Sequence, residues 1–244
     1  MTMSEQWMPG IKLALTLQEF EQLPRNPSYK YEYLDGKAHL SPRPKHYHAV
    51  LDLHAIPEDN GPDLRPLRVN EILELVPLFA DVFRTIQPFG GLSEDMRREA
   101  ARQALERTQI GGDGPWISQA SFVAQENQQI VGAILITLLP EGDLVDWESY
   151  RWLEPPPPDC IDRHIGRPHL TWIFVSPWSA GQGVGTALLD RSANALVKLG
   201  YRQLLTTFMV GNDSSMLWHW RNGFRLLSCP RSFRQIPKPK LKRN

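Results

Sequence analysis

Three closely spaced glycines, at positions 181, 183 and 185, follow a β-rich run and open a predicted helix. The stretch from Trp172 to Leu189 reads WIFVSPWSAGQGVGTALL, in which the strand ends at Val175 and Pro177 breaks it. Glycines at such a turn let the backbone approach a ligand closely and adopt positive φ. The first N–H groups of a helix lack internal partners, and together with the helix dipole they form an anion site. The residues therefore predict a phosphate-binding turn at the start of a helix over Gly183–Leu199.

The spacing of the glycines limits which kind of phosphate-containing ligand the turn is expected to bind. A Walker loop needs a Lys before its Ser or Thr, and Thr186 has none. A Rossmann turn needs G-x-G-x-x-G, whereas this chain has G-x-G-x-G. The third candidate is the pyrophosphate of coenzyme A.

The run VSPWSAGQGVGTALL resembles the acyl-CoA-binding motif of the GNAT N-acyltransferase superfamily, whose pattern is Gln/Arg-x-x-Gly-x-Gly/Ala. Both glycines are present in register, and Ala180 stands where the family has Gln or Arg. The change removes one charge-assisted contact to the pyrophosphate, worth roughly 1.5–3 kcal/mol. The resemblance implies acetyl-CoA or coenzyme A as cosubstrate, with no metal. The residues expected to bind it are Ile173, Phe174, Val175, Ala180, Gly181, Gln182, Gly183, Val184, Gly185, Thr186 and Asn212.

A second segment, NDSSMLWHWRNGF from Asn212 to Phe224, resembles the family's Asn-x-x-Ala-x-x-x-Tyr-x-x-x-Gly-Phe. Asn212 and the final Gly-Phe fit, and His219 stands where the family often has Tyr. The resemblance implies that His219 protonates the departing thiolate, since a histidine pKa near ~6.5 allows it to carry a proton. Two structural interpretations stay open: Asn212 as a helix N-cap, and His219 as a packing residue on a Trp-rich helix.

Family resemblance also implies the mechanism. The pantetheine pairs with the splayed ends of two parallel strands, predicted at 172–175 and 202–209, and an amine attacks the thioester directly. A backbone N–H within Ile173–Val175 would polarise the carbonyl, while a base removes the ammonium proton. His169 and Glu148 are the candidate bases, because they flank a long insert and the central strand. His46, His48 and His54 lack a fourth ligand, so we assign no metal.

The elements around these residues predict an α+β protein with layered helices and sheet. We expect a GNAT-like mixed, mostly antiparallel central sheet with one parallel splayed strand pair, flanked by helices. An amphipathic pattern predicts one helix over 71–85, and Ser93 is expected to cap the next. The elements are predicted in the order strand 64–69, helices 71–85 and 93–108, strands 121–125, 130–139 and 170–175, helix 183–199, strand 202–209, helix 214–221, and closing strands 224–227 and 232–236.

The first 63 residues differ in character from the rest. Thr16–Leu23 carries a capping-box pattern, and Asp35-Gly36 within 29–40 is a two-residue hairpin signal. Leu15–Pro44 resembles the opening of a family of restriction-endonuclease-like proteins, but the later metal-binding positions have no counterpart, so nuclease activity is not expected. We divide the chain into a helix-and-hairpin extension (1–63), a GNAT-like domain (64–236) and a basic tail (237–244).

Composition excludes several classes of function. The 244 residues include 27 Lys plus Arg and 27 Asp plus Glu, so no global basic surface is available for nucleic acid. Cys160 and Cys229 are too few for a disulfide framework, which favours a reducing compartment. The longest apolar run, about 10 residues, is far short of the ~20 that span a bilayer. We therefore expect a cytoplasmic protein that does not engage membranes.

The leading interpretation is an acyl-CoA-dependent N-acyltransferase that acetylates a small-molecule amine or a protein amine, with the N-terminal extension covering the sheet or forming a homodimer contact. The alternative is a catalytically inactive GNAT-fold module that binds acyl-CoA or a partner protein. A nucleic-acid-processing protein, suggested only by the N-terminal hairpin and the basic tail, is the third.

Overall fold

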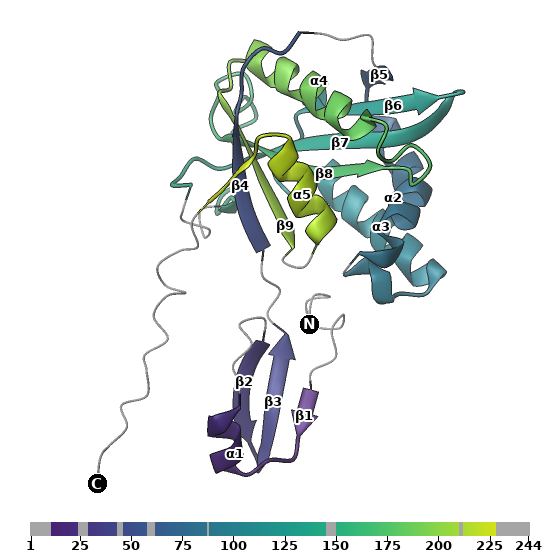
Figure 1. Ribbon diagram of the computed structural model, residues 1–244. Helices are drawn as coiled ribbons and strands as arrows, with labels where there is room; N and C mark the ends of the chain where they lie inside the picture. Colours follow the sequence, from purple (N-terminus) through teal and green to yellow (C-terminus); the bar gives the residue numbers. More distant parts are fainter. Residues whose placement is uncertain are drawn as a thin grey trace.

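The computed structural model describes residues 11–23, 29–42, 46–57, 62–86, 88–144, 150–209 and 212–227. Its larger part is a seven-stranded sheet in the order β10-β4-β9-β8-β7-β6-β5 (Figure 1). The strands are β4 (His46–Asp52), β5 (Asp63–Pro66), β6 (Phe122–Glu126), β7 (Gln129–Leu139), β8 (Arg167–Val175), β9 (Gln203–Met209) and β10 (Arg225–Leu226). Neighbouring strands are antiparallel except β8 and β9, which are parallel. This mixed, mostly antiparallel sheet confirms the predicted fold class.

The parallel pair separates along its length. The β8–β9 register joins His169 to Leu205 and Leu170 to Thr206, and no further pair forms within these two described strands. In Figure 1, β4 and β9 run steeply while β6, β7 and β8 run across the view, so the sheet opens between β8 and β9. A register shift in the β7–β8 pairing leaves Thr171 without an opposite residue, at the position where the two parallel strands part. Such a bulge bends the strand and increases its twist.

Helices cover both faces of the large sheet. On one face, α4 (Val184–Lys198) and α5 (Asp213–Arg221) pack over a core that includes Leu188, Leu196 and Phe208. On the other, α2 (Val76–Val82) and α3 (Glu94–Gln109) pack over a second core that includes Phe79, Leu105 and Phe174. We call these the α4 face and the α3 face. Ser93 caps α3 by accepting from the Met96 amide, as predicted.

The segment 71–85 is not one helix, which corrects the sequence prediction. It consists of the 3-10 helix η2 (Val69–Leu75), then α2, then the 3-10 turn η3 (Phe83–Thr85). Pro77 lies in the first turn of α2. A proline there loses no hydrogen bond, but it lacks an N–H to continue a preceding helix. The amphipathic spacing nevertheless places Ile72, Leu75 and Phe79 in the core.

Residues 11–42 form a small unit of their own. Its antiparallel sheet, in the order β1-β3-β2, comprises β1 (Ile11–Leu13), β2 (Tyr29–Leu34) and β3 (Lys37–Pro42). The predicted hairpin turn is present, with positive φ at both Asp35 and Gly36. Thr16 and Glu19 form the predicted capping box of α1 (Leu17–Gln22), and Phe20 packs on Tyr33. The described residues thus bear out the helix and hairpin, while β1 was not predicted.

The boundary at residue 63 does not separate two structural units. β4 lies inside the large sheet, where it pairs with β9 over seven positions from His46–Met209 to Asp52–Gln203. The unit with its own sheet therefore ends at residue 42 in the described chain. The predicted closing strand 232–236 and the tail 237–244 lie outside the described residues.

The remaining short helices are the 3-10 turns η4 (Phe89–Gly91) and η5 (Ser118–Ala120). Within the described ranges, we find no helix that combines the length and the apolar character needed to cross a membrane.

Candidate active site

Two glycines of the predicted turn are required by backbone conformation. Gly181 and Gly183 have φ of +79° and +84°, and a Cβ added to either would meet nothing within 4 Å. The left-handed conformation, rather than crowding, therefore calls for glycine at these positions, because other L-residues pay a steric penalty there. Both glycines are exposed, so the backbone of the turn is open to a ligand.

The first turn of α4 offers unpaired amides at the end of β8. Ala187 N donates to Gly183 O at 2.9 Å, which is the first helical hydrogen bond. The N–H groups of Val184, Gly185 and Thr186 thus have no helical carbonyl before them. The N-cap residue is Gly183, which has no side chain to cap them, and no acidic residue lies in the first turn. This arrangement fits an anion such as a pyrophosphate.

Side-chain contacts fix the loop that leads into the turn. Ser179 Oγ donates to Glu126 Oε2 at 3.1 Å, which ties the loop to the β6–β7 hairpin. Gln182 Nε2 donates to Trp178 O at 2.9 Å, and Thr186 Oγ1 donates to Asn222 Oδ1 at 2.9 Å. The side chains of Gln182 and Thr186 are thus engaged within the protein, and Ala180 supplies none of the polar contact that its position has in the family pattern. The backbone is left as the main ligand-binding element of the turn.

The gap between β8 and β9 exposes selected backbone groups of β8. Ser176 N donates to Val131 O of β7 at 2.6 Å, so Ser176 faces β7. Backbone N–H and C=O groups point to alternate sides along a strand. Those of Phe174 therefore also point toward β7, whereas those of Ile173 and Val175 point into the gap between β8 and β9. The Phe174 side chain is buried on the α3 face against Phe79. Of the three predicted residues, Ile173 and Val175 are therefore the ones whose N–H groups are placed for a ligand in the gap.

His219 is buried on the α4 face with both ring nitrogens engaged. Its Nδ1 donates to Ser215 O at 2.7 Å, since a carbonyl can only accept, and its Nε2 lies 3.1 Å from Thr206 Oγ1. The ring stacks on Phe208 with centroids 4.5 Å apart. Burial lowers the pKa of His219 to about 4, so it is neutral near pH 7. In this tautomer Nε2 carries no proton. These contacts therefore favour the interpretation of His219 as a packing residue over its role as the general acid.

His169 lies where β8 and β9 part, within a line of polar side chains on the α3 face. Its Nδ1 is 3.1 Å from Thr171 Oγ1 and its Nε2 is 3.1 Å from Thr207 Oγ1. Thr171 in turn lies 2.8 Å from Thr137, and Thr207 lies 3.4 Å from His48 Nδ1. We call Thr137, Thr171, His169, Thr207 and His48 the threonine–histidine row.

Desolvation keeps the row uncharged. It lowers the pKa of His169 to about 3, with added repulsion from His48 and then Arg167. Burial and repulsion from His46 lower the pKa of His48 to about 4. Both rings are therefore neutral at pH 7, and a group with so low a pKa is a weak base. The row provides neutral hydrogen-bonding groups rather than a strong proton acceptor.

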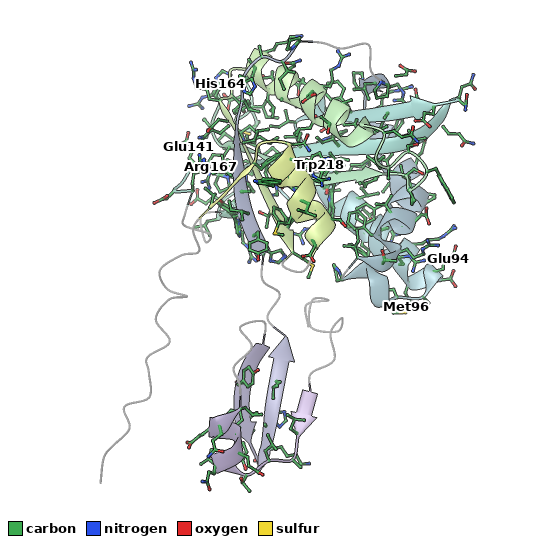
Figure 2. All side chains as sticks on the ribbon, in the orientation of Figure 1. Glu94, Met96, Glu141, His164, Arg167 and Trp218 are labelled. Atoms are coloured by element: carbon green, nitrogen blue, oxygen red, sulfur yellow. The ribbon has the colours of Figure 1, made fainter. Side chains whose placement is uncertain are left out.

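The long insert reaches this row. The Tyr150 ring lies 4.7 Å from the His48 ring between centroids, and Tyr150 Oη donates to Leu144 O at 3.0 Å. Arg167, labelled in Figure 2, donates to Pro140 O and Gly142 O, which fixes the start of the insert to β8. Glu148, the other candidate base, lies outside the described residues.

Asn212 is the N-cap of α5, where its Oδ1 accepts from Ser215 N at 3.1 Å. The structural interpretation of Asn212 is thus confirmed, and its role toward a ligand stays a prediction.

Most residues of the threonine–histidine row were not predicted from the sequence. Thr137, Thr171 and Thr207 lie on three different strands, so no local pattern connects them. A signal for His48 was present, since Tyr47, Ala49 and Leu51 alternate with it as in a half-buried strand. Among the described residues, no three potential ligands gather as a metal site.

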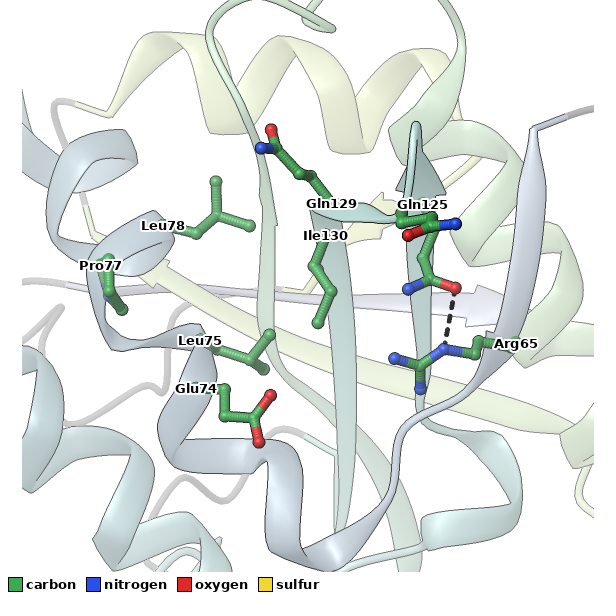
Figure 3. Close-up of a pocket in the computed structure, with 9 residues that line it drawn as sticks. Arg65, Glu74, Leu75, Pro77, Leu78, Gln125, Gln129 and Ile130 are labelled. Carbon is green, nitrogen blue, oxygen red and sulfur yellow. Dashed lines mark hydrogen bonds between the residues drawn. The ribbon is translucent and has the colours of Figure 1, made fainter.

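A hollow with a volume of about 430 Å³ lies beside β5 and the β6–β7 turn. Figure 3 shows Arg65 there in contact with Gln125, and the same guanidinium pairs with Glu71 at 2.7 Å. Its positive charge is thus already balanced. The hollow shares no residue with the glycine turn or the row, and we assign it no function.

Comparison with known proteins identifies the family. Residues 92–224, more than half of the chain, match the Acetyltransferase (GNAT) family. The match includes the glycine turn, β8, β9 and α5. The chain therefore belongs to the GNAT acetyltransferase family. This membership supports acyl-CoA-dependent acetyl transfer as its class of activity.

Three similar solved structures have low identity. The PaiA N-acetyltransferase of Thermoplasma acidophilum, in complex with coenzyme A, is 13% identical with a TM-score of 0.44, over 68% of this chain and 90% of that one. A GCN5-related N-acetyltransferase of Sphaerobacter thermophilus is 14% identical with a TM-score of 0.49, over 76% and 50%. The ribosomal-protein-alanine N-acetyltransferase of Brucella melitensis biovar Abortus 2308 is 17% identical with a TM-score of 0.37, over 60% and 79%. No curated protein matches the sequence. The restriction-endonuclease-like resemblance of the N-terminus finds no support in these comparisons.

Proposed function

We propose that the protein transfers an acetyl group from acetyl-CoA to a primary amine by direct attack in a ternary complex. The observation that carries this proposal is the uncapped first turn of α4, placed at the end of β8 where β8 and β9 separate. The turn suits the pyrophosphate, and the gap suits an extended pantetheine that pairs with strand backbone. Family membership supports the same donor.

The thioester belongs beside Ile173 and Val175 in this proposal. Their N–H groups face the gap, so either can donate to the carbonyl oxygen as negative charge develops on it. The amine nitrogen forms the new C–N bond, the C–S bond breaks, and coenzyme A leaves as the thiol after taking up a proton. A thiol has a pKa of about 8.5, so the thiolate needs only modest help to leave.

The acceptor amine approaches from the α3 face. The threonine–histidine row lies on that face at the point where the strands part, and Tyr150 of the insert borders it. His169 is assigned a positioning role: a ring with a pKa of about 3 accepts a hydrogen bond but holds a proton poorly. The amine therefore reacts as the free base, after its proton has left to solvent or to a carboxylate such as Glu148.

One observation favours the alternative of an inactive acyl-CoA-binding module. His219 occupies the position where the family often has a tyrosine that acts as the general acid. Its only ring proton, on Nδ1, is donated in a hydrogen bond to Ser215 O. The two functions share the binding site and differ only in turnover. A cytoplasmic location and a homodimer contact made by the N-terminal unit remain predictions.

Two measurements on the full chain test the proposal. Coenzyme A should raise the melting temperature, since a ligand at 100 times its Kd adds about 2.7 kcal/mol. Thiol release from acetyl-CoA should then rise when amines are added. No thermal shift at millimolar coenzyme A would contradict the proposal, and a shift without thiol release across a broad amine panel would favour the inactive module.

A further inference from the structure

Trp218 of α5, labelled in Figure 2, lies against the first turn of α4. A Cβ added to Gly185 would lie 3.2 Å from Trp218 Nε1 and 3.6 Å from Val175 Cγ2. The same added Cβ would lie 3.6 Å from Trp218 Cε2, so the nitrogen edge of the indole faces the first turn of α4, which carries the free amides. Trp218 Nε1 and the side chain of Val175, the last residue of β8, thus both lie beside Gly185 in the first turn of α4.

The indole N–H of Trp218 is unusual in this protein. Three other partly buried tryptophans each donate within the fold: Trp116 to Ser121 Oγ at 2.8 Å, Trp152 to Leu138 O at 2.8 Å and Trp172 to Thr108 Oγ1 at 3.0 Å. Among the described residues, no acceptor lies within hydrogen-bonding geometry of Trp218 Nε1. Since partly buried indole N–H groups usually have a partner, this donor is left for something outside the protein.

We propose that Trp218 Nε1 donates a hydrogen bond to the pyrophosphate of the acyl-CoA, beside the amides of Val184, Gly185 and Thr186. The inference rests on the proposed function and names a further binding residue of that same site. An indole N–H is a donor only, so it suits an oxyanion. It replaces the side-chain donor that the family pattern has at the position of Ala180.

Contact with Trp218 also accounts for the glycine at position 185, whose φ is not in the left-handed region. A methyl group there would press on the indole at 3.2 Å, which is closer than ordinary van der Waals contact. Gly185 therefore makes room for Trp218, whereas Gly181 and Gly183 serve the turn itself.

The test compares coenzyme A with pantetheine, which lacks the pyrophosphate, by calorimetric titration of the full chain. Trp218→Phe keeps an aromatic ring and removes the N–H, so the Kd of coenzyme A should rise about tenfold, since a hydrogen bond to a charged group is lost. The Kd of pantetheine should stay within about twofold. The matched control is Trp220→Phe on the same helix, an exposed residue that should change neither constant.

Equal weakening of both ligands by Trp218→Phe, or an unchanged Kd for coenzyme A, would overturn the inference. Gly185→Ala is the second variant if Trp218→Phe does not fold: displacement of the indole should again weaken coenzyme A but not pantetheine, and equal loss of both would count against it. Wild-type protein that binds no coenzyme A at all refutes the proposed function, whereas wild-type binding with no effect of either variant refutes only the role of Trp218.

Discussion

At the residue scale, the glycine at the N-cap of α4 gives a prediction about stability and binding. Gly183→Ala places a Cβ on a backbone with φ of +84°. Left-handed φ costs a non-glycine residue roughly 1–2 kcal/mol. We expect the free energy of unfolding to fall by about that amount in urea denaturation, with weaker coenzyme A binding by calorimetry. Unchanged stability together with unchanged affinity would show that the turn relaxes freely.

The buried His219 predicts a pH dependence of stability. Its folded pKa of about 4 lies below the ordinary value of 6.5, so the unfolded chain binds more protons between these values. Stability must then fall as the pH falls from 6.5 toward 4. For His219 alone, the loss from pH 7.5 to pH 5 is on the order of 2 kcal/mol. Replacing it by glutamine should reduce the pH dependence of urea unfolding by that amount, and an unaltered dependence would refute a neutral His219.

Sequence reasoning succeeded at the residue scale where chemistry is local. The glycine turn and the caps by Thr16, Ser93 and Asn212 depend on neighbours within a few positions, so spacing predicts them. The row around His169 depends on which strands lie side by side, and the position of Trp218 beside Gly185 depends on the packing of two helices. Neither is encoded in a short stretch of chain.

At the element scale, the strand order β4-β9-β8 places Thr207 between two imidazoles, those of His48 and His169. Thr207→Val keeps the shape and removes the hydroxyl that His169 and His48 share. Loss of the hydrogen bond to a partly buried nitrogen such as His169 Nε2 costs about 1–3 kcal/mol. We expect lower stability and a higher KM for the amine with an unchanged KM for acetyl-CoA, measured by thiol release. Thr207→Ser retains the hydroxyl and serves as control; equal effects of both variants would exclude the hydrogen bonds as the cause.

Element prediction was good for local patterns and poor for β4. The hairpin of β6 and β7 and the helix–strand–helix run from α4 to α5 follow from periodicity and turn residues. β4 was missed because its seven residues stand among prolines and histidines, and its pairing with β9 spans more than 150 positions of chain. Such pairing is decided by burial of both faces in the sheet, not by local propensity.

At the scale of the whole molecule, the position of β4 inside the large sheet determines how much of the N-terminus can be removed without unfolding the protein. Deletion of residues 1–42 removes the small sheet and α1 but leaves β4 in place between β9 and β10. We expect this truncated protein to fold and bind coenzyme A. Deletion of residues 1–52 exposes the edge of β9 and should give insoluble or unfolded protein. Circular dichroism and gel filtration compare the two, and loss of folding in the shorter deletion would show that the small unit is required by the large one.

Binding of acyl-CoA in the proposed site depends most on amide groups at the start of α4 that meet the pyrophosphate. Backbone NMR of the full chain, titrated with coenzyme A, reports on those groups individually. We expect saturable shifts of the Val184, Gly185 and Thr186 amide signals, with an affinity equal to the calorimetric one. Binding of coenzyme A that leaves these three signals unmoved would contradict the proposed pyrophosphate site.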